Sequence, residues 1–351
     1  MNDQPAPTDG ESTDATSTNP SSPAPPAAPP TTTATPAGSP AVRPTQSEKF
    51  IPIRRMHEAI TAEIGKLFVG QDELIRGTLT ALFAGGHVLI ESVPGLGKTL
   101  FVRTLGQVLG CDNGRIQFTA DLMPSDITGA PVFDVQTSEF RFRPGPVFTQ
   151  FLLADEINRS PAKTHAALLE IMQEYRVTID GTSHRVPKPF LVMATQNPLE
   201  SEGTYNLPEA QLDRFMFKLR VDYPAADQEA EILKLHSRQV DLNQRLREEV
   251  QTITSPDQVR AAIELCGQVL VEDRLVDYIN AIVRATRTWP AFHIGGSPRA
   301  GLAFVQTARV LAAFAGRRLS LAGVSALAGA AVAATIALVA SSTLFWTIAG
   351  A

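Results

Sequence analysis

The segment that most constrains this chain lies at residues 87–106, where a short apolar run is followed by a glycine-rich turn and a helix-forming stretch. It reads HVLIESVPGLGKTLFVRTLG. Glycines let successive backbone N–H groups curl around phosphate oxygens, and a helix that begins at the turn adds partial positive charge. The order of strand, loop and helix therefore predicts a phosphate-binding loop inside an α/β fold.

The side chains at the end of this loop fit a nucleotide that carries a metal ion. Lys98 is expected to reach the β- and γ-phosphates, and the hydroxyl of Thr99 is expected to ligate Mg²⁺. One position departs from the pattern G-x-x-x-x-G-K-[ST], because Ser92 stands where the first glycine is expected. A serine can still make the turn, but it adds a Cβ beside the loop, and weaker binding is one expected consequence.

A phosphate loop of this kind needs acidic groups that hold the metal and activate water. The apolar run FLLAD ends in Asp155 and is followed by Glu156. We expect Asp155 to bind the Mg²⁺ shell through water, and Glu156 to orient and polarise the attacking water. On its own such a pair is equally typical of a solvated strand end, so the prediction depends on the phosphate loop.

Two further polar positions fit the same chemistry. In FLVMATQNP, Asn197 follows an apolar run, where its amide is expected to position water beside the γ-phosphate. In LPEAQLDRF, Arg214 precedes another apolar run and is expected to reach the nucleotide of a neighbouring subunit, since phosphoryl transfer gains from a cation on the developing charge. A turn-forming asparagine and a surface arginine are the plain alternatives at these two positions.

The chain divides into four regions by composition. Residues 1–47 form a Pro-, Thr- and Ala-rich tail, because residues 1–46 hold 11 of the 26 prolines and no Leu, Ile, Phe, Tyr or Trp, and this composition predicts disorder. Residues 48–225 are expected to form a nucleotide-binding domain, and residues 226–318 a small helical domain. The last region, 319–351, contains no charged residue.

Near-continuous apolar runs that alternate with helical stretches indicate a parallel sheet covered on both faces. The candidate strands are HVLIE (87–91), RIQFT (115–119), FLLAD (151–155), FLVMA (190–194) and FMFKLRV (215–221). Before them, Ile60, Ile64, Leu67 and Phe68 recur at helical spacing. From about residue 227 the strand signals stop and the pattern is helical.

Charge and cysteine content narrow the class of protein further. The net charge is -5, whereas a protein that coats nucleic acid normally carries a basic excess, so no nucleic-acid partner is expected. Two cysteines, Cys111 and Cys266, cannot form a disulfide framework, which suits a reducing compartment such as the cytoplasm. The six histidines are scattered and predict no metal cluster.

The chain resembles the MoxR family of AAA+ ATPases over roughly residues 52–318, through a series of motifs in the same order. They are LIESVPGLGKT, DLMPSDITGA, FRPGPVF, LLADEINRSPAKTHAALLEIMQE, TIDG, VMATQNP, LPEAQLDRF and GGSPRA. The resemblance implies a three-layer αβα P-loop domain with a parallel sheet, a small all-α lid, and a hexameric homo-oligomeric ring with ATP between subunits.

The resemblance also assigns roles to individual residues. It implies that Asn197 is the sensor 1 residue, that Arg214 is the arginine finger, and that Arg299 is the sensor 2 arginine, carried by the lid onto the γ-phosphate. Asp155 and Glu156 are the Walker B pair. The expected nucleotide-binding positions are Val69 and Gly70 near adenine and the Walker A residues Pro94, Gly95, Leu96, Gly97, Lys98, Thr99 and Leu100.

Members of such a family are expected to use ATP hydrolysis to mature or remodel client proteins, often ones with von Willebrand factor A domains and metal or cofactor sites. Hydrolysis removes a phosphate that the nucleotide-binding domain, the lid and the neighbouring subunit are all expected to contact. The angle between the two domains is therefore expected to change. Segment 122–146 is implied to lie near the ring pore. Two roles are open for Phe140 and Phe142, of which packing is favoured over gripping a partner.

The C-terminal stretch departs from the family, which usually ends in a polar, charged helix. Residues 319–351 are 33 uncharged residues, more than the roughly 20 needed to cross a bilayer. Three interpretations are open: a membrane anchor that tethers the ring to the inner face of the membrane, a lid helix without a polar face, and a coding alteration that replaced the usual tail. Each puts the completeness of the lid, and so the placement of Arg299, in question.

Three functions are weighed on this basis. The first is a Mg²⁺-dependent ATPase that remodels or matures partner proteins. The second is an ATP-gated scaffold that binds nucleotide without hydrolysing it. The third is a motor subunit of the magnesium-chelatase type, which needs further subunits. The first is favoured, because both halves of the hydrolytic site are present in the sequence.

Overall fold

The computed structural model describes residues 48–68, 70–93, 95–197, 205, 207–221, 223, 226–237, 241–290 and 294–316. The expected tail 1–47, the uncharged stretch 319–351, Val69 and Pro94 lie outside these described residues. Within the described ranges, no helix has the length and apolar character needed to cross a bilayer.

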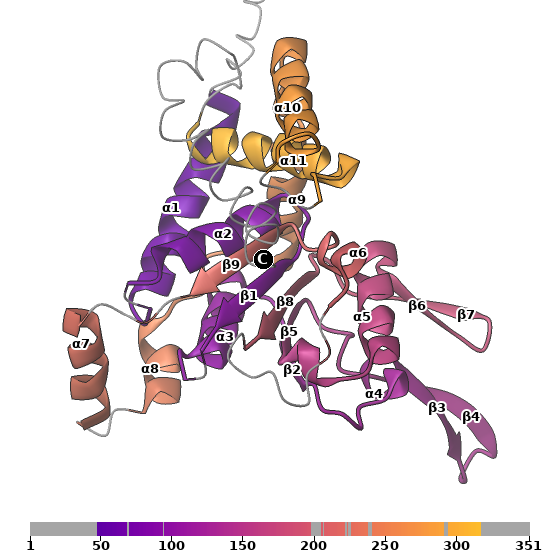
Figure 1. The fold of residues 1–351 in the computed structure, drawn as a ribbon. Coiled ribbons are helices and arrows are strands. Elements are labelled where there is room, and N and C mark those ends of the chain that lie inside the picture. The colour runs from indigo at the N-terminus through magenta and orange to yellow at the C-terminus, as the bar shows by residue number, and fades with distance from the viewer. Residues whose placement is uncertain are drawn as a thin grey trace, which may run out of the picture. The chain divides into compact units, whose positions relative to one another are not determined.

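A five-stranded parallel sheet is the centre of the fold (Figure 1). Its strand order is β2-β5-β8-β1-β9. The strands are β1 (Val88–Ser92), β2 (Asn113–Gln117), β5 (Phe151–Asp155), β8 (Leu191–Gln196) and β9 (Phe217–Val221). All five match the candidate strands of the sequence, with ends shifted by up to two residues because strand ends depend on pairing.

The central strands are buried on both faces, which explains why they read as continuous apolar runs. Along β5, Phe151 and Leu153 join one apolar cluster, whereas Leu152 and Ala154 join a second cluster on the opposite face. Helices cover both faces of the sheet. The second face is covered in part by α4 (Pro124–Thr128) and α5 (Ala162–Glu174). This confirms the expected three-layer αβα arrangement.

The first face is covered by α1 (Ile51–Gly65), α2 (Asp72–Phe83) and α3 (Lys98–Leu109). Ile60 and Ile64 are fully buried, as their helical spacing predicts. Leu67 and Phe68 lie beyond this helix, since α1 ends at Gly65 and α2 begins at Asp72. Helix α3 is followed by Gly110, whose left-handed φ of 62° gives a glycine C-cap.

Two antiparallel hairpins form separate two-stranded sheets and extend beside α4 and α5 (Figure 1). One pairs β3 (Gly129–Asp134) with β4 (Glu139–Pro144), and the other pairs β6 (Arg176–Ile179) with β7 (Thr182–Arg185). On the first hairpin, Phe140 is 74% exposed, whereas the ring of Phe142 stacks on His184 with centroids 4.0 Å apart. The favoured role of packing inside the molecule therefore applies to Phe142, whereas Phe140 is exposed and meets only the edge of the Phe133 ring, 5.2 Å away across the hairpin, among the described ring contacts.

The elements that the structure describes after β9 are all helices, joined by short irregular segments. Its helices are α7 (Ala226–Ser237), α8 (Leu242–Glu249), α9 (Pro256–Gly267), α10 (Asp273–Thr286) and α11 (Pro298–Phe314). Short elements elsewhere are η1 (Glu48–Phe50), η2 (Ile157–Arg159) and α6 (Glu209–Leu212). Helix α9 starts with a capping box between Ser255 and Gln258, followed by Pro256 at the first helical position, so its start is encoded locally.

One apolar cluster joins the C-terminal helices to the nucleotide-binding half. Val310 and Ala313 of α11 share it with residues of α1 and α2, and α11 contacts both of these helices. The C-terminal helices thus pack on the α1–α2 side of the sheet. Close packing of this kind determines where the first turn of α11, which carries Arg299, must lie.

Candidate functional site

The expected phosphate loop lies between the carboxyl end of β1 and the start of α3. Gly95 and Gly97 have φ values of +87° and +75°, a region in which glycine is favoured. Lys98 is the first residue of α3, and Thr99 follows it as an exposed side chain. Successive N–H groups of such a loop, together with a helix N-terminus, are suited to bind an anion.

The unusual Ser92 is the last residue of β1 rather than part of the open loop. Its side chain is 2% exposed, and its hydroxyl finds no hydrogen-bond partner among the described residues. The serine therefore extends the buried strand by one residue. The replacement of glycine at this position affects the base of the loop and not its anion-facing turn.

The segment expected near adenine lies beside the phosphate loop. Phe68 packs against Phe101 of α3 with ring centroids 5.2 Å apart, and a Cβ at Gly97 would lie 3.5 Å from the Phe68 ring. Gly70, at φ +79°, is in close approach to the side chain of Gln228 on α7, where any Cβ would collide. The described part of this segment is thus held between α3 and α7.

The two acidic residues meet a polar residue of β8 at the carboxyl edge of the sheet. Asp155 ends β5, and Thr195 on the neighbouring β8 donates to its Oδ1 at 2.6 Å. The backbone N–H of Glu156 donates to the same Thr195 oxygen at 2.9 Å. Glu156 has a left-handed φ of 56°, which is strained for a residue with a side chain. Asn197, just beyond β8, is 7% exposed.

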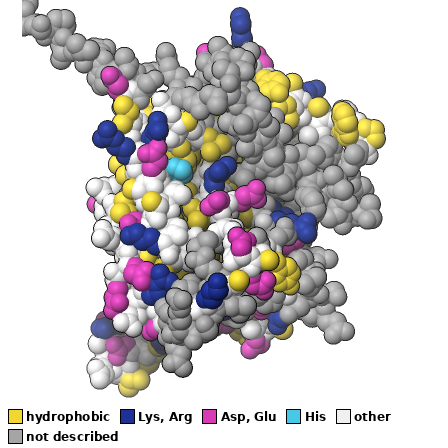
Figure 2. All heavy atoms as spheres, turned by 90° about the vertical axis from the view of Figure 1, so that its left-hand side faces the viewer, with side chains coloured by type: hydrophobic (Ala, Val, Ile, Leu, Met, Phe, Trp, Pro, Cys, Tyr) yellow, Lys and Arg dark blue, Asp and Glu magenta, His cyan; other side chains and the backbone are white. Residues whose placement is uncertain are grey.

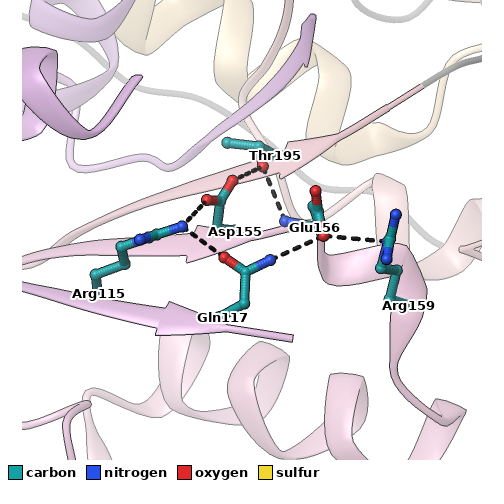
Figure 3. Close-up of polar contacts among 6 residues, drawn as sticks. All are labelled: Arg115, Gln117, Asp155, Glu156, Arg159 and Thr195. Carbon is teal, nitrogen blue, oxygen red and sulfur yellow. Dashed lines mark hydrogen bonds and ion pairs between the residues drawn. The ribbon is translucent and has the colours of Figure 1, made fainter. Parts of the chain in front are cut away.

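Both carboxylates also have basic or amide partners that the sequence did not single out (Figure 3). Arg115 Nη2 on β2 donates to Asp155 Oδ2 at 2.7 Å and to Gln117 Oε1 at 2.6 Å. Gln117 Nε2 donates to Glu156 Oε2 at 2.8 Å. Arg159 Nε lies 3.1 Å from the same Glu156 oxygen. The signal for these residues was the strand RIQFT, because β2 is the parallel neighbour of β5 and brings its polar positions to the same edge.

The two other arginines lie elsewhere. Arg214 precedes β9, so it is at the amino edge of the sheet, roughly 15 Å from the phosphate loop along the strand direction. Arg299 is in the first turn of α11. With the Gln173 amide oxygen turned toward Arg299, that oxygen accepts from Nη1 at 3.0 Å and from Nη2 at 2.7 Å. Gln173 is at the end of α5, which leaves the carboxyl edge and finishes at the opposite one.

The expectation that Arg299 lies on the γ-phosphate of its own subunit therefore does not agree with the structure. Arg299 and Arg214 line one cavity of about 670 Å³, together with Gly86 and His87, which precede β1. Packing of α11 on α1 and α2 accounts for this, because it directs the start of α11 to the amino edge. The structure brings these two arginines together and separates both from Lys98.

Two buried groups complete the electrostatics. His87 Nδ1 accepts from the Val192 N–H at 3.0 Å, while Nε2 lies 3.1 Å from the Met172 carbonyl. Burial lowers the pKa of His87 to about 4, so this ring is neutral near pH 7. Burial raises the pKa of both Cys111 and Cys266 to about 12, and both are free thiols.

The described surface carries charges of both signs. On the face drawn in Figure 2, basic and acidic side chains are interspersed, and neither sign gathers into one continuous patch there. This arrangement is typical of a solvated protein surface.

Comparisons with known proteins agree with this geometry. The family model described as "ATPase family associated with various cellular activities (AAA)" matches residues 87–217, and the model of an AAA lid domain matches residues 284–319. The chaperone MoxR1 of Mycobacterium tuberculosis is 45% identical over 266 residues, which cover 73% of this chain and 68% of that protein. The protein MoxR of Methylorubrum extorquens is 33% identical over 279 residues, covering 73% and 79%.

A solved structure is similar as well. The crystal structure of a candidate ATPase from Cytophaga hutchinsonii is 40% identical in sequence and has a TM-score of 0.71, covering 80% of this chain and 87% of that one. The five-stranded parallel sheet, the C-terminal helices and these relatives lead to one conclusion. The chain belongs to the MoxR family of AAA+ ATPases.

Proposed function

We propose that this protein binds ATP with Mg²⁺ at the carboxyl edge of the sheet, hydrolyses it, and uses the resulting movement to remodel or mature partner proteins. The observation that carries the proposal is the position of Asp155 and Glu156. Asp155 ends β5 and Glu156 follows it, and both bond to Thr195 of β8, the strand that lies between β5 and the loop-bearing β1. A phosphate loop and two adjacent carboxylates at one edge are the parts that phosphoryl transfer requires.

The residues at this edge fit a magnesium ion. Mg²⁺ prefers hard oxygen ligands and keeps several waters, and the exposed Thr99 hydroxyl and the Asp155 carboxylate are groups of that kind. When bound, the metal would neutralise charge on the β- and γ-phosphate oxygens. Lys98 would bind the phosphates from the start of α3, and Glu156 would accept a proton from the attacking water.

The positions of Arg214 and Arg299 support a site shared between subunits. Both arginines line the same cavity at the amino edge, as do Ser297 and Asp213, which are hydrogen-bonded to each other. We propose that this amino-edge surface meets the phosphate loop of the next subunit in a ring, which we expect to be hexameric. Both cations would then stabilise charge on the neighbour's nucleotide.

The name of one relative supports a proposal about partners. The relative from M. tuberculosis is named a chaperone. We propose client proteins, including ones with von Willebrand factor A domains, as the substrates of the motion, and the cytoplasm as the compartment. Membrane attachment through residues 319–351 remains a separate proposal that a chain ending at Arg318 would test by membrane fractionation.

The central experiment measures Mg²⁺-dependent ATP binding and hydrolysis by the full chain beside two variants. Lys98→Ala is expected to lose nucleotide binding. Glu156→Gln is expected to bind ATP and to lose turnover by about 10²–10⁴-fold, the usual contribution of a positioned general base. Nucleotide binding with negligible turnover in the unaltered chain, and no effect of Glu156→Gln, would instead favour the ATP-gated scaffold.

A further inference from the structure

Lys218 of β9 lines the same cavity as Arg214 and Arg299, yet its charge is engaged inside its own chain. Its side chain is only 9% exposed, and its Nζ atom lies 2.9 Å from Glu91 Oε1. The Glu91 side chain is 14% exposed and stands one residue before the end of β1, the strand that leads into the phosphate loop. One largely buried ion pair thus joins the wall of the cavity to the strand that carries the loop.

Strand geometry explains how this pair forms. Side chains alternate along a strand, so Glu91 is on the same face of β1 as Leu89, which belongs to the apolar cluster on the α4–α5 face. Lys218 stands opposite Leu89 on β9, between Phe217 and Leu219, which both join the cluster on the other face. Lys218 therefore shares the face of Glu91, and its long side chain reaches along β1 toward the carboxyl edge.

The same oxygen of Glu91 also holds the end of β8. Gln196 is the register partner of Glu91 on that strand, and its Nε2 atom donates to Glu91 Oε1 at 3.0 Å. Gln196 is the last residue of β8, and Asn197 follows it directly. A continuous series of contacts therefore runs from Lys218 through Glu91 and Gln196 to the residue expected to position the attacking water.

The burial of the pair determines what happens when one partner is lost. A carboxylate that keeps little contact with water is costly without its cation, and removal of one member of a buried pair costs more than removal of both. Without Lys218, the Glu91 carboxylate is expected to turn toward water and to release Gln196. If Glu91 is changed to an amide as well, no unpaired charge is left, and the amide oxygen can still accept from Gln196.

We propose that Lys218 is a positioning residue for the nucleotide site of its own chain: through Glu91 it holds Gln196, and so fixes the place of Asn197 beside the phosphate loop. The inference rests on the proposed function, since it requires ATP hydrolysis at the carboxyl edge. It separates Lys218 from Arg214 and Arg299, which line the same cavity but are proposed to serve the nucleotide of the neighbouring subunit.

The first test compares ATP turnover with the binding of a non-hydrolysable fluorescent ATP analogue, both with Mg²⁺. In Lys218→Met, kcat is expected to fall about ten- to a hundredfold, the usual effect of a small misplacement at a reacting centre. The Kd for the analogue is expected to change by less than about threefold, because Asn197 acts on water and not on ATP binding. A loss of binding as large as the loss of turnover would overturn the positioning role.

Lys188→Met is the matched control for this test. It makes the same substitution at an exposed lysine that precedes β8 and whose Nζ lies over the Tyr175 ring, 4.7 Å from its centroid. Turnover is expected to stay within about twofold of the unaltered protein, as for most exposed side chains. An equal loss in this variant would show that the effect of Lys218→Met does not depend on the pair with Glu91.

The second test follows the contact series by combining substitutions. Adding Glu91→Gln to Lys218→Met is expected to raise kcat at least about threefold above Lys218→Met alone, since the buried charge is gone and the contact with Gln196 is kept. Gln196→Leu is expected to lower kcat about as far as Lys218→Met, and the two together no further. No gain in the first combination, or multiplied losses in the second, would overturn the route through Glu91 and Gln196.

The third test decides which nucleotide Lys218 serves. Lys98→Ala and Lys218→Met subunits are mixed in equal amounts. If Lys218 serves its own chain, the mixture retains about half the activity of Lys218→Met alone, because every intact loop then belongs to a subunit that lacks Lys218. Recovery to about a quarter of the unaltered activity would show that an intact Lys218 on the neighbour suffices, and would overturn the inference.

The outcomes distinguish this inference from the proposed function. If the unaltered chain does not hydrolyse ATP, the proposed function itself is wrong and the inference falls with it. If it does and Lys218→Met keeps full turnover, only the inference is overturned. Should Lys218→Met fail to fold, Gln196→Leu decides the question, because it leaves the ion pair between Lys218 and Glu91 in place; full turnover in Gln196→Leu contradicts the inference.

Discussion

Ser297 Oγ donates a hydrogen bond to Asp213 Oδ1 at 2.7 Å, although the two residues are 84 positions apart in the chain. The same Ser297 oxygen caps α11 by accepting from the N–H groups of Arg299 and Ala300. Asp213 directly precedes Arg214. One hydroxyl therefore fixes the start of the helix that carries Arg299 against the residue next to Arg214, and this explains why the two arginines share a cavity.

Asp213→Ala is expected to reduce ATP turnover, because the relative position of Arg214 and Arg299 is then less well fixed. The free energy of unfolding is expected to fall by only about 1 kcal/mol, as for the loss of one partly buried hydrogen bond. Ser297→Ala loses the cap as well, so its cost is expected to be about 1–2 kcal/mol. Urea unfolding and steady-state ATPase assays measure the two effects. Ser297→Thr is the matched control, because it keeps the hydroxyl; full activity in Asp213→Ala would show that the contact does not position the arginines.

Mixing inactive variants tests whether Arg299 acts on a neighbouring subunit. Lys98→Ala and Arg299→Ala are each expected to be inactive alone. When they are mixed, roughly a quarter of the interfaces in a random ring would pair an intact loop with an intact arginine, so part of the activity should return. The control mixture is Lys98→Ala with Glu156→Gln, which should stay inactive because both residues belong to the same side of the interface. Failure of the first mixture, with success of Lys98→Ala plus Arg214→Ala, would place Arg299 in its own subunit's site.

His87 is expected to make stability depend on pH. Its pKa is about 4 in the folded protein and 6.5 without burial, so the unfolded chain binds more protons between these values. Stability is then complete above about pH 6.5 and falls as the pH drops toward 4, by about 3 kcal/mol in total. In His87→Gln the unfolding free energy should depend less steeply on pH in this window, whatever its value at pH 7. If the free energy of unfolding of the variant depends on pH as steeply as that of the unaltered protein, His87 takes up protons equally well in the folded and unfolded states. Burial also lowers the pKa of His57 and His165, which leaves a residual slope in the variant.

The β3–β4 hairpin offers a contrast between two phenylalanines on the same face of one strand. Phe142 stacks on His184 and contacts Phe148, so Phe142→Ala is expected to cost about 2 kcal/mol, less than a fully buried ring. Phe140 is 74% exposed near the tip and pairs across the hairpin with Phe133, so Phe140→Ala is expected to cost less, about 0.5–1 kcal/mol. Chemical denaturation of both variants checks this, and equal losses would contradict the described hairpin geometry.

Local features of the site were predictable because they depend on neighbours in the sequence. The phosphate loop can be recognised from the glycines around Lys98, because they form the turn themselves. The pair Asp155 and Glu156 can be recognised because it stands at the end of an apolar strand. The five strands followed from burial on both faces, which demands continuous apolar runs. The two hairpins were not predicted, because a strand such as Thr182–Arg185 has exposed, polar residues and no apolar period.

The sequence by itself determined that a phosphate loop and a carboxylate pair exist, and that a parallel sheet carries them. Only the tertiary structure decided which groups surround that pair. Arg115 and Gln117 became partners of Asp155 and Glu156 because β2 lies beside β5, a neighbour relationship that strand order creates. It also decided that Arg299 shares a cavity with Arg214. The reason is physical: a motif records the chemistry of a residue, whereas its position relative to distant residues depends on how helices such as α11 pack their apolar faces.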